Sequence, residues 1–398
     1  MELSPPVLKD LVSAGQCIAY VGAGFSMPCG MPSWSALLVD LADYVEQNHS
    51  KDYSIENSLN DARLFISGGD LVVAASILKS LLSKSELNRQ VARQFSLSRL
   101  HESDSLTKKI MQERFAGLIG SNFSGIITTN YDTLIEYGLS LDARRSYKQS
   151  TIEDDQLGDV LCRSEFNQRF FVKLHGSITN GGYVLSTEEY GRVYIRRPST
   201  KVFLLAAMLQ YHFVFLGCSL EDEVLGLRRE ACETFSGNLP LAYALLPDNK
   251  RNHSRAKWLF DNCLIQTLFY VPKETGRKLH RHHGVEVFLN ELKASDDPAY
   301  LEIVSAPAVS YSTETSDQKD KMLLSIGTMN RSILRFITSR GGIQHSELLY
   351  GTTRDLMPIG VRSISHAELF YRIQFLISSG MILEKVEVDG RLKYFGKT

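Results

Sequence analysis

Several polar side chains that could take part in acid–base chemistry stand directly after apolar runs of this sequence. Asn130 and Asp132 follow the run Gly125–Thr129, and His175 follows Phe170–Leu174. An imidazole exchanges protons near neutral pH, so we interpret His175 as a general base. Open α/β sheets bind ligands at the carboxyl ends of their strands, which makes Asn130 and Asp132 candidate site residues. For Asn130 the alternative, a cap of the helix that follows, fits the spacing equally well.

Two glycine turns follow two other apolar runs, and the first of them has the composition of a phosphate-binding loop. The run Ile18–Val21 breaks into Gly22–Gly24, and the run Phe213–Leu216 breaks into Gly217–Ser219. Glycine lets a backbone turn tightly and approach a pyrophosphate closely. The hydroxyl of Ser26 can donate to a ligand or cap the helix expected to follow, whose N-terminus would then face the anion.

Strands alternate with helices over the first three quarters of the chain. The expected strands cover residues 18–21, 125–129, 170–174, 213–216, 241–246 and 265–270. This alternation predicts an α/β fold with a doubly wound parallel sheet. Between the first two strands, about residues 35–120 have helical periodicity, which predicts an inserted helical module that packs on the sheet or covers the cofactor.

The composition changes after the helix expected at Val285–Leu292. Residues 293–320 are rich in Ser, Thr, Asp and Pro and predict a linker between a domain at 1–292 and a small domain at 321–398. The last segment has the pattern of three helices and a hairpin turning at Asp389 and Gly390, which predicts a winged-helix-like α+β domain. Its helix at 365–375 is mostly apolar, so docking or oligomerisation is favoured over DNA reading, and nucleic acid would be met only through this domain or a partner.

Composition and charge exclude some classes of protein. The formal net charge is −1 over 398 residues, so no global attraction to nucleic acid or anionic membrane is expected. The N-terminus has no leader pattern and no apolar stretch is of membrane-spanning length, which predicts a cytoplasmic protein with no membrane partner. No two of the six cysteines are in C-x-x-C spacing, and the run His280–His283 reads as a solvated helix start, so no metal site is expected.

Four segments taken together resemble the sirtuin superfamily. In chain order they are GAGFSMPCGMP, TTNYD, KLHGS and GCSLED, each at the end of an expected strand. The first matches that family's loop pattern GAG-x-S-x-x-x-G-x-P. The resemblance covers roughly residues 10–292 and implies a Rossmann-like, sirtuin-type domain that binds NAD.

Departures from the deacylase sirtuins point to a different branch of that superfamily. Deacylases carry a four-cysteine zinc module and continue the loop with an aspartate, a phenylalanine and an arginine, whereas this chain has Ser33 and Trp34 there. TTNYD and G-x-S-x-x-D look like the bacterial sirtuin-like proteins that hydrolyse NAD in anti-phage defence, often paired with an Argonaute-like protein or a HerA-type hexameric ATPase. The resemblance to the HerA-paired kind implies an NAD+ glycohydrolase that releases nicotinamide and ADP-ribose, uses NAD as substrate without zinc, forms a homo-oligomer and is regulated by a partner.

The same resemblance implies a role for each candidate residue. Asn130 would position the attacking water or ribose hydroxyl, His175 would be the base, and Asp132 would bind the nicotinamide carboxamide. The residues that would hold the rest of the dinucleotide are Gly22, Ala23, Gly24, Ser26, Pro32, Gly217 and Ser219.

Two other functions fit the sequence. An ADP-ribosyltransferase or NAD-dependent deacylase would keep the fold and change the acceptor, and modified protein in place of free ADP-ribose would reveal it. A non-catalytic nucleotide sensor associated with DNA through the C-terminal domain would bind NAD without consuming it and would bind DNA in a salt-dependent manner.

Overall fold

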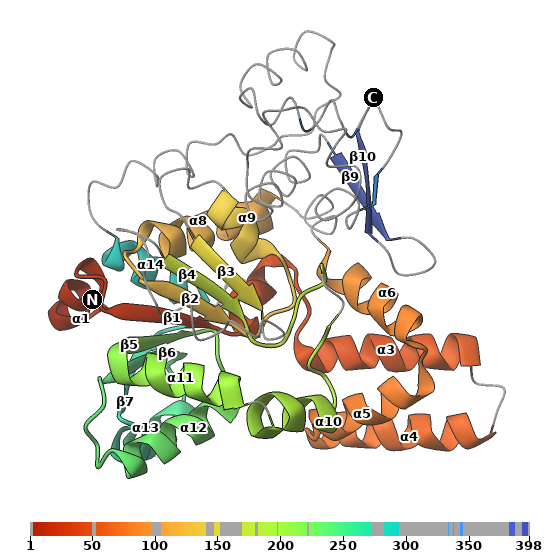
Figure 1. Ribbon diagram of the computed structural model, residues 1–398, viewed down its shortest axis with the longest axis horizontal. Helices are drawn as coiled ribbons and strands as arrows, with labels where there is room; N and C mark the ends of the chain where they lie inside the picture. Colours follow the sequence, from red (N-terminus) through yellow and green to blue (C-terminus); the bar gives the residue numbers. More distant parts are fainter. Residues whose placement is uncertain are drawn as a thin grey trace, which may run out of the picture.

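A seven-stranded parallel sheet forms the centre of the computed structural model (Figure 1). The structure describes residues 3–49, 53–96, 105–140, 147–151, 169–179, 182–196, 198–220, 223–272, 282–293, 333, 337, 343–344, 382–386 and 392–396. The strands are β1 (Cys17–Val21), β2 (Gly125–Thr128), β3 (Tyr147–Thr151), β4 (Arg169–Lys173), β5 (His212–Leu216), β6 (Ala242–Pro247) and β7 (Ile265–Tyr270). Their spatial order is β3-β4-β2-β1-β5-β6-β7, and every neighbouring pair is parallel. The predicted α/β fold with a parallel sheet is confirmed.

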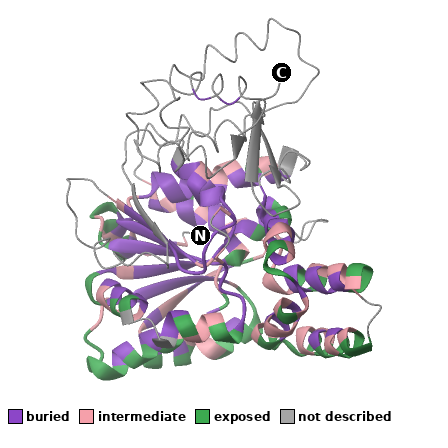
Figure 2. Ribbon diagram, turned by 45° about the vertical axis from the view of Figure 1, so that its right-hand side comes forward, coloured by how far each residue is buried: buried purple, intermediate pink, exposed green. Residues whose placement is uncertain are grey.

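Both faces of the sheet are covered, which explains the uninterrupted apolar runs of the central strands. In β1 every residue is buried, but successive side chains enter different hydrophobic clusters. Cys17, Ala19 and Val21 belong to one cluster, whereas Ile18 and Tyr20 belong to the other. Figure 2 shows the buried strands between helices whose outer faces are exposed. A strand with a core on each side has no solvent face and therefore shows no polar alternation.

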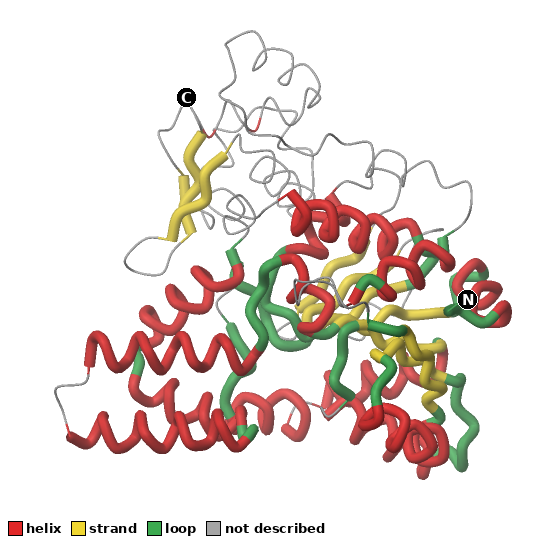
Figure 3. Tube along the Cα trace, turned by 180° about the vertical axis from the view of Figure 1, so that it is seen from behind, coloured by secondary structure: helices red, strands yellow, loops and turns green. Residues whose placement is uncertain are grey.

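Helices fill the long segment between β1 and β2. They include α3 (Trp34–His49), α4 (Tyr53–Gly68), α5 (Leu71–Leu81), α6 (Lys84–Phe95) and α8 (Ser105–Gly120). Figures 1 and 3, which view the molecule from opposite sides, show α3 to α6 projecting beyond one end of the sheet. The last helix, α8, instead lies over the sheet and packs against α14 (Gly284–Leu292). The insert thus has a projecting part and a part that belongs to the core.

The remaining helices connect the strands and cover the sheet. They are α1 (Pro6–Ser13), α2 (Ala23–Ser26), the 3-10 turn η1 (Met27–Cys29), α9 (Leu134–Ser140), α10 (Thr187–Tyr190), the π-helical turn η3 (Gly191–Arg196), α11 (Pro198–Gln210), α12 (Glu223–Thr234) and α13 (Lys250–Cys263). Among the described residues, no helix combines the length and the apolar character that crossing a membrane requires.

The C-terminal region contributes a small antiparallel sheet. Its strands are β8 (Ile343–Gln344), β9 (Ile382–Val386) and β10 (Leu392–Gly396), in the order β8-β10-β9. The expected hairpin is therefore present as the β9–β10 pair. Three expected features lie outside the described residues. They are the helices in 321–398, apart from the isolated residues 333 and 337; the linker 293–320, apart from residue 293; and residues 280 and 281 of the histidine cluster. The winged-helix-like domain remains a prediction.

Candidate active site

The four motifs singled out in the sequence follow four strands that are adjacent in space. β4, β2, β1 and β5 are consecutive in the sheet, so the segments after them meet at its carboxyl edge. Main-chain hydrogen bonds join these segments: the Gly22 amide donates to Leu216 O at 3.0 Å, and the Leu174 amide donates to Thr128 O at 2.8 Å. The structure therefore brings together groups that are up to two hundred residues apart in the chain.

The two glycine turns pack directly on each other. The Gly24 amide donates to Gly217 O at 2.9 Å, and a Cβ atom on Gly22 or Gly24 would lie 2.8 Å from that same oxygen. Gly217 has φ +66°, and a Cβ atom there would lie 2.2 Å from the Phe25 nitrogen. We expected these glycines to admit a pyrophosphate, but the contact that visibly requires them is the approach of one turn to the other. The roles of Gly22, Gly24 and Gly217 in binding remain predictions, as do those of the exposed Ala23 and the partly exposed Pro32.

The amide of Asn130 is oriented by two acceptors. Its Nδ2 donates to Gly22 O at 3.1 Å and to Ser26 Oγ at 3.0 Å. Because a carbonyl oxygen only accepts, the bond to Gly22 fixes which end of the amide is Nδ2. Asn130 is only 6% exposed, yet the opposite atom of its amide, Oδ1, has no hydrogen-bond partner among the described residues. A buried acceptor without a partner is costly, so Oδ1 is suited to accept from a donor such as water or a hydroxyl.

Asp132, not Asn130, caps the helix that follows. Its Oδ1 accepts from the Leu134 amide at 3.0 Å, at the start of α9, which decides the alternative left open for Asn130. Asp132 is 2% exposed, and burial raises the pKa of its carboxyl. The nearby ammonium of Lys173, the Leu134 amide and the Ser26 hydroxyl act in the opposite direction on that pKa.

Lys173 stabilises the turn that contains Asp132, and it was not predicted from the sequence as part of the site. Its ammonium is buried, donates to the main-chain oxygen of Asp132 and pairs with Glu136 at 2.7 Å. Burial raises the pKa of Glu136, and the Lys173 ammonium opposes that change. The pair ties the end of β4 to the first turn of α9 and so holds the backbone between Asn130 and Asp132.

His175 is buried and neutral at the end of β4. Its Nε2 lies 2.7 Å from the hydroxyl of Tyr194, and burial lowers the pKa of the imidazole from 6.5 to about 3. Gly176, with φ +84°, reverses the chain directly afterwards, and the Val184 amide donates to His175 O at 3.0 Å. The imidazole is thus held by its backbone and by one phenol, and its lowered pKa makes it a weaker proton acceptor than a free imidazole. The general-base role of His175 remains a prediction.

A series of aromatic ring contacts connects His175 to the helical insert. The Tyr190 ring lies 5.1 Å from the imidazole and stacks on Tyr194 and on Trp34, each at 6.0 Å. The neighbouring Glu189 accepts from Lys79 of α5 at 2.6 Å. The histidine is therefore linked, through the segment that carries Tyr190, to the projecting part of the insert.

The two candidate serines occupy different environments. Ser26 is 1% exposed and lies in α2, where it accepts from Asn130. It does not cap α3 as we had considered, because the Ser33 hydroxyl accepts from the Ala36 amide there. Ser219 is exposed, and its main-chain oxygen accepts from the Arg255 guanidinium. Its proposed contact with the adenosine half remains a prediction.

The part of the chain that the structure describes has no cluster of metal ligands, and the thiols of Cys17 and Cys29 are not activated. No group of three or more histidine, cysteine or acidic side chains there could hold a metal ion. Burial raises the pKa of the Cys17 and Cys29 thiols to about 12. Such thiols are poor nucleophiles near neutral pH.

Comparison with known proteins agrees with this geometry. A family model described as a SIR2-like domain matches residues 124–268, from the residue before β2 into β7, and so includes Asn130, Asp132, His175 and Gly217. Among curated proteins, the NAD(+) hydrolase ThsA of Cytobacillus dafuensis is 23% identical over 284 residues. That alignment covers 71% of this chain and 48% of the relative, so the chain spans about half the length of that protein. The chain is thus similar to sirtuin-like NAD-utilising enzymes.

Proposed function

We propose that this chain is an NAD+ glycohydrolase that cleaves NAD+ to nicotinamide and ADP-ribose. The observation that carries the proposal is the unpartnered, buried Oδ1 of Asn130, which lies beside the first glycine turn and at the same sheet edge as a neutral histidine. Because the amide is oriented by two hydrogen bonds and its acceptor is unused, Oδ1 is suited to bind a hydrogen-bond donor of a ligand or water. The match to a SIR2-like domain and the likeness to an NAD(+) hydrolase support NAD as the substrate.

The proposed chemistry assigns each group a step. The bond between the nicotinamide nitrogen and the ribose carbon breaks, nicotinamide leaves as a neutral base, and a cation-like ribose develops. Asn130 accepts from the attacking water and holds it on the sugar, and the ribose hydroxyl of the product comes from that water. His175 accepts the one proton that the reaction releases, and for this step substrate binding has to raise the pKa of the imidazole from about 3 toward neutrality. Asp132 binds the carboxamide of the leaving group.

The proposal also includes a biological role and a partner protein. We propose that the chain is the NAD-depleting effector of an anti-phage defence system and works as a homo-oligomer with a HerA-type ATPase or another defence protein. This part rests on the resemblance of the four motifs to defence-associated sirtuin-like proteins. A free NAD hydrolase would damage its own host, so the activity has to be held back until a partner or signal releases it.

A time course of NAD with purified protein tests the proposal. Wild type is compared with Asn130→Ala and His175→Ala, each alone and with the neighbouring gene's product, while nicotinamide and ADP-ribose are quantified. His253→Ala, which removes an exposed histidine of α13, and Asn262→Ala on the same helix are the matched controls.

We expect stoichiometric nicotinamide and free ADP-ribose, and a loss of about two to four powers of ten in rate for His175→Ala if it is the base. Wild-type turnover in either site variant would contradict the assigned roles. ADP-ribose found on protein would identify a transferase instead. NAD that is bound but never consumed under any condition would overturn the hydrolase.

A further inference from the structure

A buried arginine lies directly beneath the first glycine turn. Arg114 of α8 and Arg228 of α12 are the two largest side chains that are fully buried in the described residues, at 1% and 0% exposure. An arginine is rarely withdrawn from water unless its donors are all directed at acceptors. The acceptors that each arginine has found therefore indicate what it holds in place.

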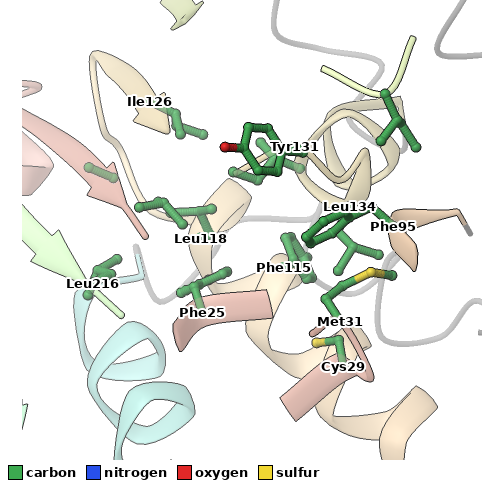
Figure 4. Packing of buried hydrophobic residues seen from close by; sticks show 14 of the residues in the cluster. Phe25, Cys29, Met31, Phe95, Phe115, Leu118, Ile126, Tyr131, Leu134 and Leu216 are labelled. Atoms are coloured by element: carbon green, nitrogen blue, oxygen red, sulfur yellow. The ribbon is translucent and has the colours of Figure 1, made fainter. Parts of the chain in front are cut away.

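Arg114 holds the backbone of α2. Its Nη1 donates to Phe25 O at 2.9 Å and, less closely, to Gly24 O at 3.4 Å. The guanidinium lies over the Phe25 ring, 5.3 Å from its centre. The next residue of α8, Phe115, packs edge-on against the same ring at 5.2 Å, and Figure 4 shows these two rings together in the core. Two successive residues of α8 thus hold one turn of the loop, by its carbonyls and by its side chain.

A carboxylate from a third segment fixes the guanidinium. Glu286 of α14 accepts from Arg114 Nε at 2.7 Å, and Nη2 lies 2.6 Å from the same oxygen. Nη2 also donates to His282 O at 3.2 Å. The planar group is thereby locked in one orientation, which a single ammonium could not achieve because it lacks the forked geometry.

The loop that Arg114 holds is the one that orients the candidate catalytic amide. Phe25 precedes Ser26, whose hydroxyl accepts from Asn130 Nδ2. We propose that Arg114, locked by Glu286, is a positioning residue that holds the first glycine turn in the form that binds the dinucleotide and orients Asn130. This inference rests on the proposed function, since the ligand is the dinucleotide named there.

Arg228 provides a matched control at the opposite edge of the sheet. It donates to Cys263 O and Pro240 O, each at 2.7 Å, and to Leu264 O at 3.3 Å. These oxygens lie just before β6 and β7, at their amino ends, whereas the candidate site is at the carboxyl ends. Arg114→Lys and Arg228→Lys each exchange a forked group for a single ammonium in a buried setting, but only the first change is beneath the glycine turn.

The experiment measures binding separately from turnover. The affinity for ADP-ribose, a proposed product that is not consumed, is determined by calorimetry for wild type, Arg114→Lys, Arg228→Lys and Glu286→Gln, with thermal unfolding of each. We expect both lysine variants to lower the unfolding temperature, but only Arg114→Lys to weaken ADP-ribose binding by roughly tenfold or more. Glu286→Gln keeps an acceptor for Arg114 and should have a smaller effect. An Arg114→Lys affinity within about twofold of wild type, in a folded variant, would overturn the inference.

Amide hydrogen exchange separates this inference from the proposed function. If wild type binds neither ADP-ribose nor NAD, the hydrolase proposal fails, yet exchange in residues 22–29 still reports on the loop. Faster exchange there in Arg114→Lys, and not in Arg228→Lys, would support the positioning role. Equal exchange in both variants would refute it.

Discussion

Lowering the pH should reduce the stability of the folded protein through the protonation of His175, by an amount that unfolding measurements can detect. The folded state lowers the pKa of the imidazole from 6.5 to about 3, because the ring is buried. In the unfolded chain the ring binds a proton once the pH falls below its ordinary pKa, whereas in the folded state it stays neutral until about pH 3. Across that window the unfolded state holds more protons, so stability falls as the pH falls.

The size of the effect follows from the same two pKa values. Each pH unit inside the window lowers the free energy of unfolding by about 1.4 kcal/mol. Between about pH 7.5 and pH 5 the His175 contribution is therefore about 2 kcal/mol, and at pH 3 it is about 4 kcal/mol.

Urea unfolding at a series of pH values tests this reasoning. Wild type is compared with His175→Gln, which has no group that titrates in the window, and with His253→Gln on the exposed surface of α13. Other groups change the stability of all three proteins alike, so the informative quantity is the difference between the curves. We expect His175→Gln to lose about 2 kcal/mol less than wild type on going to pH 5, and His253→Gln to follow wild type. Parallel curves for wild type and His175→Gln would refute the buried, neutral state of the imidazole.

Three further substitutions test the supports of the site by urea unfolding. Gly217→Ala places a Cβ atom 2.2 Å from the Phe25 nitrogen at a positive φ, so we expect a loss of more than about 1 kcal/mol, and an unchanged midpoint would contradict the loop-on-loop contact. Lys173→Met leaves Glu136 buried without its ammonium and should cost about 3–5 kcal/mol, most of which a second change, Glu136→Leu, should restore. Tyr194→Phe removes the hydrogen bond to the imidazole and should cost about 1 kcal/mol, so an effect near zero would show that this bond is not formed in solution.

The parts of the fold that could be predicted are those with a local signal. β1, β2, β4 and β5 are apolar runs that end in glycine or polar residues, and this pattern revealed both the strands and the edge where they meet. β3 was missed because its sequence, YKQST, is polar. It is an edge strand of the sheet, with β4 as its partner, and its pairing depends on that neighbour.

The supports of the candidate site could not be predicted because they depend on pairs far apart in the chain. Arg114 and Glu286 each appear in the sequence as an ordinary charged residue of a helix, and only the packing of α8 on α14 withdraws both from water. Tyr194 contacts His175 from a π-helical turn, which the hydrophobic pattern of the sequence did not predict. A lysine that ends an apolar strand, as Lys173 does, is the one signal that could have been used, since burial of its ammonium demands a partner.

The position of β1 in the sheet also determines when a nascent chain can acquire its site. β1 is synthesised early, yet residue 18 pairs with residue 125 on one side and with residue 213 on the other. At roughly 5–20 residues per second, the central strand waits about ten seconds or more for its second neighbour. The first glycine turn packs on Gly217 and cannot reach its folded form before that residue has been made. A chain that stops short of this point therefore lacks the packed pair of glycine turns at the carboxyl edge of the sheet.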